Sequence, residues 1–114
     1  MDEPVFLRPE EGERIRDHRA LVELPHVEAV ELWFPADFEG VAPHTHPDRT
    51  DSFYVLEGEV EFFQAGEWHR AGPGAFTSNP PGVEHGFRPA GTAIRLLNLH
   101  TPRVGFVDSL RHRS

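Results

Sequence analysis

The chain has 114 residues, which is enough for one ordinary domain and too few for two. Its net charge of -8 argues against a nucleic-acid partner, because an acidic surface repels phosphate groups. The sequence contains no cysteine, and all 11 of its Lys+Arg residues are arginine, so thiol nucleophiles, disulfides and Schiff-base lysines are excluded.

The N-terminal stretch MDEPVFLRPEEGERIRDH is charged throughout and lacks the apolar core of a signal peptide. Elsewhere no segment approaches the roughly 18 consecutive apolar residues that a membrane-spanning helix needs. Together with the absence of cysteine, these features lead us to expect a cytoplasmic protein with no membrane partner.

Four segments show the alternation of apolar and polar residues that is typical of β-strands. They are residues 28–34, 51–57, 59–65 and 93–100. In the first segment Val30, Leu32 and Phe34 fall on one face, and Trp33 falls on the other. Short alternating strands at this spacing predict an all-β sandwich or barrel.

Glycine and proline mark the turns between these strands. The turn signals are EG at 57–58, AGE at 65–67, GPG at 72–74 and PPG at 80–82. The tail, residues 104–114, predicts a short helical segment, since Phe106 and Leu110 are four positions apart. No internal repeat or linker interrupts the chain, so we expect residues 1–114 to form a single domain.

The pair His44 and His46 places two imidazoles on one side of an extended segment, where both can bind one ion. Taken alone, such a pair is also common on protein surfaces. Asp51 follows in the same phase as Phe53, which we expect to point inward, and a buried carboxylate is costly unless it is paired or bound to a metal. His85, which comes after the PPG turn, is a fourth candidate ligand.

Four further histidines stand alone in segments rich in charged or turn residues, and we expect these side chains on the surface. They are His18, His26, His69 and His112. His100 differs, because it shares a predicted strand face with Leu96 and Asn98 and could therefore line a cavity.

Two segments resemble the sequence motifs of the cupin family. The motif G-x5-H-x-H-x3,4-E-x6-G corresponds here to HTHPDRTDSFYVLEG at 44–58, and the motif G-x5-P-x-G-x2-H-x3-N corresponds to GAFTSNPPGVEH at 74–85. They follow one another in the order that the family has. With the flanking strands, the resemblance covers most of the chain.

The resemblance implies a cupin fold, which is a double-stranded β-helix or jelly-roll barrel, here with the short C-terminal helical turn beyond it. It also implies one divalent transition metal ion (Fe, Mn, Ni, Cu or Zn) inside the barrel. The implied ligands are His44, His46, Asp51 and His85.

The chain departs from the family pattern at three positions. Asp51 stands where the family usually has glutamate, so its shorter arm could bind the metal loosely or through water. Only three residues separate Gly40 from His44, where the motif has five. Pro89 replaces the asparagine of the second motif, which concerns a loop more than the metal.

The family includes dioxygenases, decarboxylases, isomerases, epimerases and non-catalytic domains, so the fold leaves the reaction open. We expect a metal-dependent enzyme of the dioxygenase type that acts on a small organic molecule. The predicted lining of its interior consists of Phe34, Phe53 and Phe87, together with Phe63 or Phe76. A non-catalytic binding or sensing protein is the first alternative, and an isomerase or epimerase is the second. The absence of lysine and of an evident inward arginine cluster disfavours a sugar-phosphate substrate.

His100 is the predicted residue for proton transfer, because the only tyrosine, Tyr54, should face away from the interior. Tyr54, Trp33 and Leu56 all fall on the outward phase of their strands. Outward aromatic side chains on two strands predict a homodimer that forms through one sheet.

Overall fold

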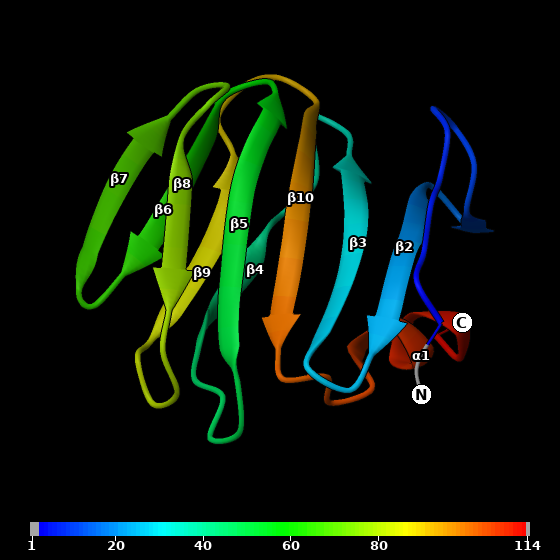
Figure 1. Cartoon of the computed structure of the whole chain (residues 1–114). Coiled ribbons are helices and arrows are strands. Elements are labelled where there is room, and N and C mark those ends of the chain that lie inside the picture. Colours follow the sequence, from blue (N-terminus) through cyan, green and yellow to red (C-terminus); the bar gives the residue numbers. More distant parts are fainter. Residues whose placement is uncertain (1–2, 114) are drawn as a thin grey trace.

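The computed structural model describes residues 3–113, which form two β-sheets and one short helix (Figure 1). The elements in this part of the chain are β1 (Glu13–Ile15), β2 (His18–Leu24), β3 (Val27–Phe34), β4 (Val41–His44), β5 (Thr50–Glu57), β6 (Val60–Gln64), β7 (Glu67–Ala71), β8 (Phe76–Asn79), β9 (His85–Pro89), β10 (Ile94–Thr101) and α1 (Phe106–Arg111). The predicted strands and the predicted C-terminal helix are confirmed.

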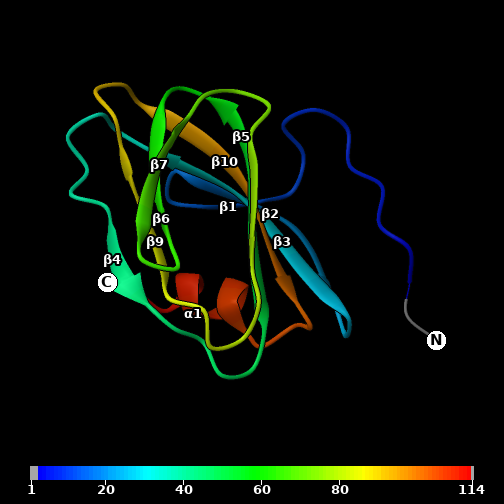
Figure 2. The ribbon, with the colours of Figure 1, turned by 90° about the vertical axis from the view of Figure 1, so that its left-hand side faces the viewer.

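The strands form a six-stranded sheet of order β1-β2-β3-β10-β5-β8 and a four-stranded sheet of order β4-β9-β6-β7, with antiparallel pairing throughout. The two sheets form opposed layers, and α1 lies at one end of the space between them (Figure 2). Pairs such as β3–β10 and β4–β9 join distant parts of the chain, as in a jelly roll. The predicted all-β fold class is therefore confirmed.

The core lies between the sheets and follows the predicted alternation. Val30 and Leu32 of β3 are buried, as are Phe53 and Val55 of β5, while the intervening Tyr54 is 40% exposed. Each strand thus presents one apolar face to the other sheet, which is the arrangement that period-two patterns favour.

Gly58, between β5 and β6, illustrates how a turn residue is required by the packing. Its φ is 85°, and an added Cβ would lie 2.1 Å from the carbonyl oxygen of Ala93. Only glycine combines this positive φ with such a close approach of another backbone. The turn predicted at 57–58 is confirmed.

Helix α1 is attached to the six-stranded sheet by Glu28 of β3. The Glu28 carboxylate is buried and accepts hydrogen bonds from four consecutive backbone N–H groups, those of residues 104–107. These groups at the start of a helix have no partner within the helix, so the carboxylate satisfies them. Within residues 3–113, no helix is long and apolar enough to cross a membrane.

Candidate metal centre

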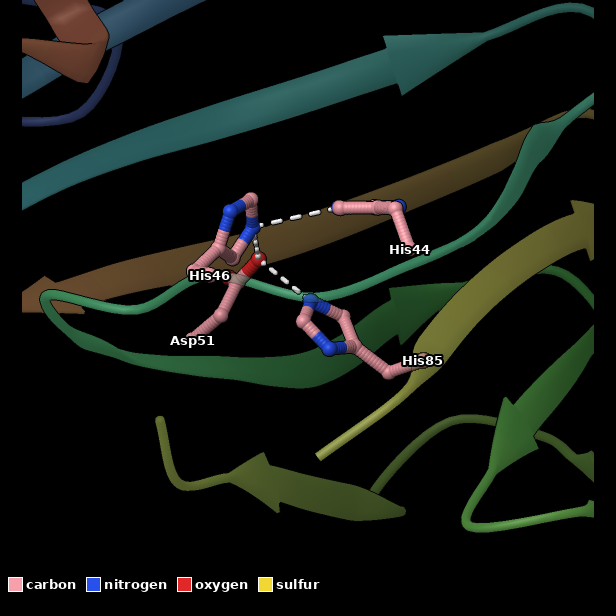
Figure 3. Close-up of side chains that lie close together, drawn as sticks. All are labelled: His44, His46, Asp51 and His85. Carbon is pink, nitrogen blue, oxygen red and sulfur yellow. Dashed lines mark hydrogen bonds and ion pairs between the residues drawn. The ribbon is translucent and has the colours of Figure 1, made fainter. Parts of the chain in front are cut away.

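The structure brings the four predicted ligands together at one end of the barrel interior (Figure 3). His44 ends β4, His46 lies in the loop that follows, Asp51 lies in β5 and His85 begins β9. Each offers one ligand atom, and these atoms all lie within 4.8 Å of one another. The cluster therefore joins both sheets and both of the sequence motifs.

Strand register explains the convergence. His44 lies directly opposite His85 in the β4–β9 pair, so both imidazoles leave the same sheet side by side. The turn at 80–82 is tied to the other motif, because the backbone N–H of Gly82 donates to the carbonyl oxygen of His46 at 2.9 Å. The two motifs thus hold each other in place before any ion binds.

Two of the imidazoles have a fixed tautomer. Nδ1 of His44 lies 2.8 Å from the carbonyl oxygen of Ala42, and Nδ1 of His85 lies 2.9 Å from that of Val83. Because a carbonyl oxygen only accepts, each Nδ1 carries the hydrogen and donates it. The lone pair of each Nε2 is then directed at the centre of the cluster, as a metal ligand requires.

One contact at the centre is repulsive unless a positive charge lies beside it. Oδ2 of Asp51 is 3.1 Å from Nε2 of His85, and both atoms carry lone pairs when the His85 ring is neutral. Nε2 of His44 is 3.1 Å from Nε2 of His46, which can donate to it if it carries the hydrogen of the His46 ring. A divalent cation satisfies all four together, so the donor set fits the implied metal ion.

Asp51 is suited to this role in spite of its short side chain. It is 4% exposed, and its Oδ1 accepts a hydrogen bond of 2.7 Å from the amide of Asn98. Burial alone raises the pKa of Asp51, but the hydrogen bond with His85, the charge that His100 acquires in acid and the Asn98 amide outweigh it and lower the pKa below its usual value. The carboxylate is therefore ionised at neutral pH.

The histidine pKa values are affected in opposite directions. Burial, followed by the positive charge of Arg49, lowers the pKa of His46, which keeps this imidazole neutral and available as a ligand. Burial also lowers the pKa of His85, but its hydrogen bonds with Asp51 and Val83 outweigh that effect and raise the pKa overall. A proton on His85 thus meets the same need for positive charge that a metal ion would meet.

His100 lies behind the ligands rather than on the cavity wall. It is 1% exposed, and its ring stacks on Phe106 with centroids 4.1 Å apart. Nδ1 accepts from Nε of Arg49, and Nε2 donates to Oδ1 of Asn98, both at 2.8 Å. Burial lowers the pKa of His100 to about 4, so the ring is neutral at neutral pH. Its role in proton transfer stays a prediction.

The candidate ligands open onto a cavity of about 450 Å³, whose wall combines phenylalanine side chains with polar and charged ones. The predicted lining residues Phe34, Phe53 and Phe87 all contribute to it. The prediction for Phe63 and Phe76 is wrong: Phe63 packs against Trp68, and Phe76 is 58% exposed. In β6 the buried residues are Val60 and Phe62, so Phe63 has the opposite phase, and Phe76 is the register partner of the outward Tyr54.

Three features of the cavity were missed in the sequence. His18 was expected on the surface, but it is half-buried, lines the cavity and accepts a hydrogen bond from the backbone N–H of Trp33 at 3.2 Å. Arg49 lines the cavity beside His46, although no inward arginine cluster was evident in the sequence. Phe106 reaches the cavity from α1. The other three lone histidines, at 26, 69 and 112, are exposed as predicted.

Comparison with known families and structures agrees with this geometry. The Cupin_2 family model, described as a cupin domain, matches residues 34–100, which is more than half of the chain and includes all four ligands. No curated protein matches the chain.

Several solved structures share the fold. KdgF from Halomonas sp. is 20% identical with a TM-score of 0.76, and the match covers 91% of this chain and 96% of that one. An RmlC-like cupin from Shewanella frigidimarina NCIMB 400 is 27% identical with a TM-score of 0.74, covering 88% and 92%. The DMSP lyase DddQ from Ruegeria pomeroyi DSS-3 is 28% identical with a TM-score of 0.61, covering 68% of this chain and 39% of that one.

Proposed function

The chain belongs to the cupin family, and on this basis we propose that it is a metal-dependent enzyme that acts on a small organic molecule by dioxygenase-type chemistry. One observation carries the proposal: four ligand atoms within 4.8 Å of one another lie at the wall of a cavity of about 450 Å³. A cavity of this size accepts a small molecule and excludes a macromolecule.

Three neutral imidazoles and one carboxylate suit Fe, Mn, Ni, Cu or Zn. What a divalent ion supplies in such a site is polarisation of a substrate oxygen and a lower pKa for a hydroxyl bound to it. His44, His46, Asp51 and His85 would hold the ion. The carbonyl partners of His44 and His85 and the amide partner of Asp51 keep these ligands oriented, so binding requires little rearrangement.

The remaining wall keeps water away from the substrate. Phe53 and Phe87 are buried beside the ligands, and Phe34 stacks on Phe38 with centroids 4.2 Å apart. Apolar rings strengthen electrostatic interactions at the site, and outside the ligand set the lining imidazole and carboxylate groups that can exchange protons are His18 and Asp48. An oxygenase needs little acid–base assistance from the protein, whereas an isomerase or epimerase needs an acid and a base near the substrate. The wall therefore favours oxygen chemistry.

A lyase is the second candidate, and a specific observation favours it. The structure of the DMSP lyase DddQ is 28% identical to this chain over 68% of its length. An elimination needs a base that removes a proton from carbon, and His18 on the cavity wall is a side chain of the right type.

The test begins with protein purified without chelators and then loaded separately with each of the five metals. Oxygen uptake is measured with a panel of enols, diketones and catechols, and the His44→Ala, His85→Ala double variant serves as the control. Oxygen consumption that accompanies substrate loss only in the loaded parent protein supports the oxygenase. An unsaturated product formed without oxygen from β-substituted acids supports the lyase. Ligand binding without turnover identifies a binding protein, and a parent protein that takes up no metal refutes both enzyme proposals.

Assembly as a homodimer is also proposed. Tyr54 and Phe76 are register partners on the outer face of the six-stranded sheet, where they are 40% and 58% exposed. Exposed neighbouring aromatic side chains favour an interface with a second copy. A light-scattering mass near 12.9 kDa at micromolar concentration would reject the dimer.

A further inference from the structure

Arg49 is the cation nearest to the metal ligands, and the metal site itself does not explain it. It lies in the loop between β4 and β5, between the ligands His46 and Asp51. Its side chain is 14% exposed and lines the cavity, and its Nη2 lies 3.4 Å from Nε2 of His46. A guanidinium beside a cation-binding site is electrostatically unfavourable unless an anion lies between them.

The hydrogen bonds of Arg49 leave part of its guanidinium free for a ligand. Nε donates to Nδ1 of His100 at 2.8 Å, and Nη1 donates to Oδ1 of Asp48 at 3.1 Å. Asp48 is 57% exposed, so that pair is weak and easily exchanged. Among the described residues, the one contact of Nη2 is Nε2 of His46, whose lone pair belongs to the metal ion. Within residues 3–113, Nη2 then has no other acceptor.

A buried chain of hydrogen bonds sets the position of Arg49 relative to Asp51. Because arginine only donates, Nδ1 of His100 accepts, and its Nε2 must carry the hydrogen that it donates to Asn98 at 2.8 Å. The Asn98 amide then donates to Asp51 at 2.7 Å and to the carbonyl oxygen of Ser52 at 3.0 Å. Each N–H group in this series of hydrogen bonds has its own acceptor, so the positions of the guanidinium and the Asp51 carboxylate are coupled.

We propose that Arg49 binds the carboxylate of the substrate while a neighbouring oxygen of the same molecule coordinates the metal ion. The substrate class is then a small 2-hydroxy, 2-oxo or enol acid. His100 and Asn98 are positioning residues for Arg49. This inference rests on the proposed function, because it requires the metal ion.

Charge supports an anionic substrate. A divalent ion together with Arg49, Asp48 and Asp51 leaves the site with a net positive charge, although the chain as a whole carries -8. Planar guanidinium groups bind carboxylates with charge-assisted hydrogen bonds, which are stronger than neutral ones. A neutral substrate of the same shape would leave the positive charge uncompensated.

The experiment compares lactate with its neutral analogue lactamide as probes. Each is titrated into the Co²⁺-loaded protein, and binding is followed by the absorption spectrum of the cobalt ion, with metal content measured separately. We expect the parent to prefer lactate. In Arg49→Gln, lactate affinity should fall about 10- to 100-fold while lactamide affinity is unchanged. Metal content should stay equal or rise, because a neighbouring cation has been removed.

Three further variants sharpen the test. Arg88→Gln is the matched control, since Arg88 is exposed and stacks on Trp68 with its guanidinium 3.9 Å from the ring centroid. It should change neither affinity. Arg49→Lys should recover part of the lactate preference, because it keeps the charge but loses the planar geometry. His100→Gln should reduce the preference while the metal stays bound.

Several results would overturn the inference. They are unchanged lactate affinity in Arg49→Gln, loss of metal in that variant, or equal or no binding of the two probes by the loaded parent. A parent that binds no cobalt refutes the proposed function itself, and the inference with it. Metal content therefore separates the two failures.

Discussion

Two carboxylates, Glu28 and Asp51, are buried on the inner face of the same sheet, but they have different partners. Glu28 is 0% exposed and accepts hydrogen bonds from four backbone N–H groups of residues 104–107. Asp51 is 4% exposed, and its Oδ2 faces the Nε2 atoms of His46 and His85 at 3.2 and 3.1 Å.

The difference shows that burial of a carboxylate does not by itself identify a functional site. Glu28 is fully satisfied by the chain, so its charge serves to hold α1 against the sheet. Asp51 faces Nε2 of His85, which needs a proton or a metal ion before it attracts the carboxylate. The identity of the partners, and the hydrogens that they carry, distinguishes a structural carboxylate from a ligand.

The largest expected effect is a loss of metal affinity at the ligand cluster that contains Asp51. Replacing His44 and His85 together by alanine removes two of four ligands and should weaken metal binding by about 10⁴-fold or more, since four-ligand sites bind with roughly 10–16 kcal/mol. Metal content after dialysis, measured by atomic emission, should fall from about one ion per chain to near zero. Full occupancy in the double variant would remove the basis for treating the two carboxylates differently.

The next largest expected effect is a loss of folding stability when the Glu28 carboxylate is removed. Glu28→Ala leaves four backbone N–H groups without their acceptor and should lower the free energy of unfolding by about 3–5 kcal/mol. Urea unfolding measures the change, and Glu57→Ala, on the exposed end of β5, is the control that should shift it by under about 0.5 kcal/mol. Glu28→Gln offers a milder variant if Glu28→Ala does not fold. Metal affinity per folded molecule should be unchanged in both Glu28 variants. A loss of affinity as large as that of a ligand variant would contradict the purely structural role of Glu28.

Acid should lower the free energy of unfolding through His100 and through Glu28 in different pH ranges. Burial and the charge of Arg49 lower the pKa of His100 from 6.5 to about 4, so the unfolded chain takes up this proton first as the pH falls. Stability is therefore lost between pH 6.5 and about 4, and the loss from His100 reaches about 3 kcal/mol at pH 4. For Glu28, burial raises the pKa, but the four backbone hydrogen bonds lower it below 4.5, so its contribution is present above that pH and is lost only as the pH falls further.

Urea unfolding of chelator-treated protein across a pH series checks this order. His100→Gln should show a shallower decline between pH 6.5 and 4, whereas Glu28→Gln should keep the parent slope there and differ below it. Identical slopes for His100→Gln and the parent would contradict the buried neutral state of His100.

The smallest expected effect is the loss of metal affinity when Asp51 alone is replaced, and it tests whether Asp51 is a metal ligand. Asp51→Ala should weaken metal binding about 10- to 100-fold, because three imidazoles remain, and Asp51→Glu should retain most of the affinity. The free energy of unfolding of the metal-free variant should fall by about 1–3 kcal/mol, because one N–H of the buried Asn98 amide loses its acceptor while the other keeps its bond to the carbonyl oxygen of Ser52. Competition with a metal-binding dye measures the affinity. A value equal to the parent's would show that Asp51 is a structural carboxylate like Glu28.

The sequence by itself determined the fold class and the candidate ligands. Alternation identifies the strands because successive side chains point to opposite faces, and it assigns Asp51 to the inner face with Phe53. The spacing of His44 and His46 and the turn before His85 are equally local features. These signals do not depend on which strands are neighbours, and the structure brings the four candidate ligands within 4.8 Å of one another.

Only the tertiary structure decided what surrounds those ligands. Arg49 lies in a loop, where no period indicates direction, and His18 reaches the cavity because β2 joins β3 in one sheet. The position of Phe106 over His100 depends on Glu28, whose hydrogen bonds join residues more than 70 positions apart. Contacts of this kind depend on how separate elements pack, and local patterns of apolar and polar residues do not encode them.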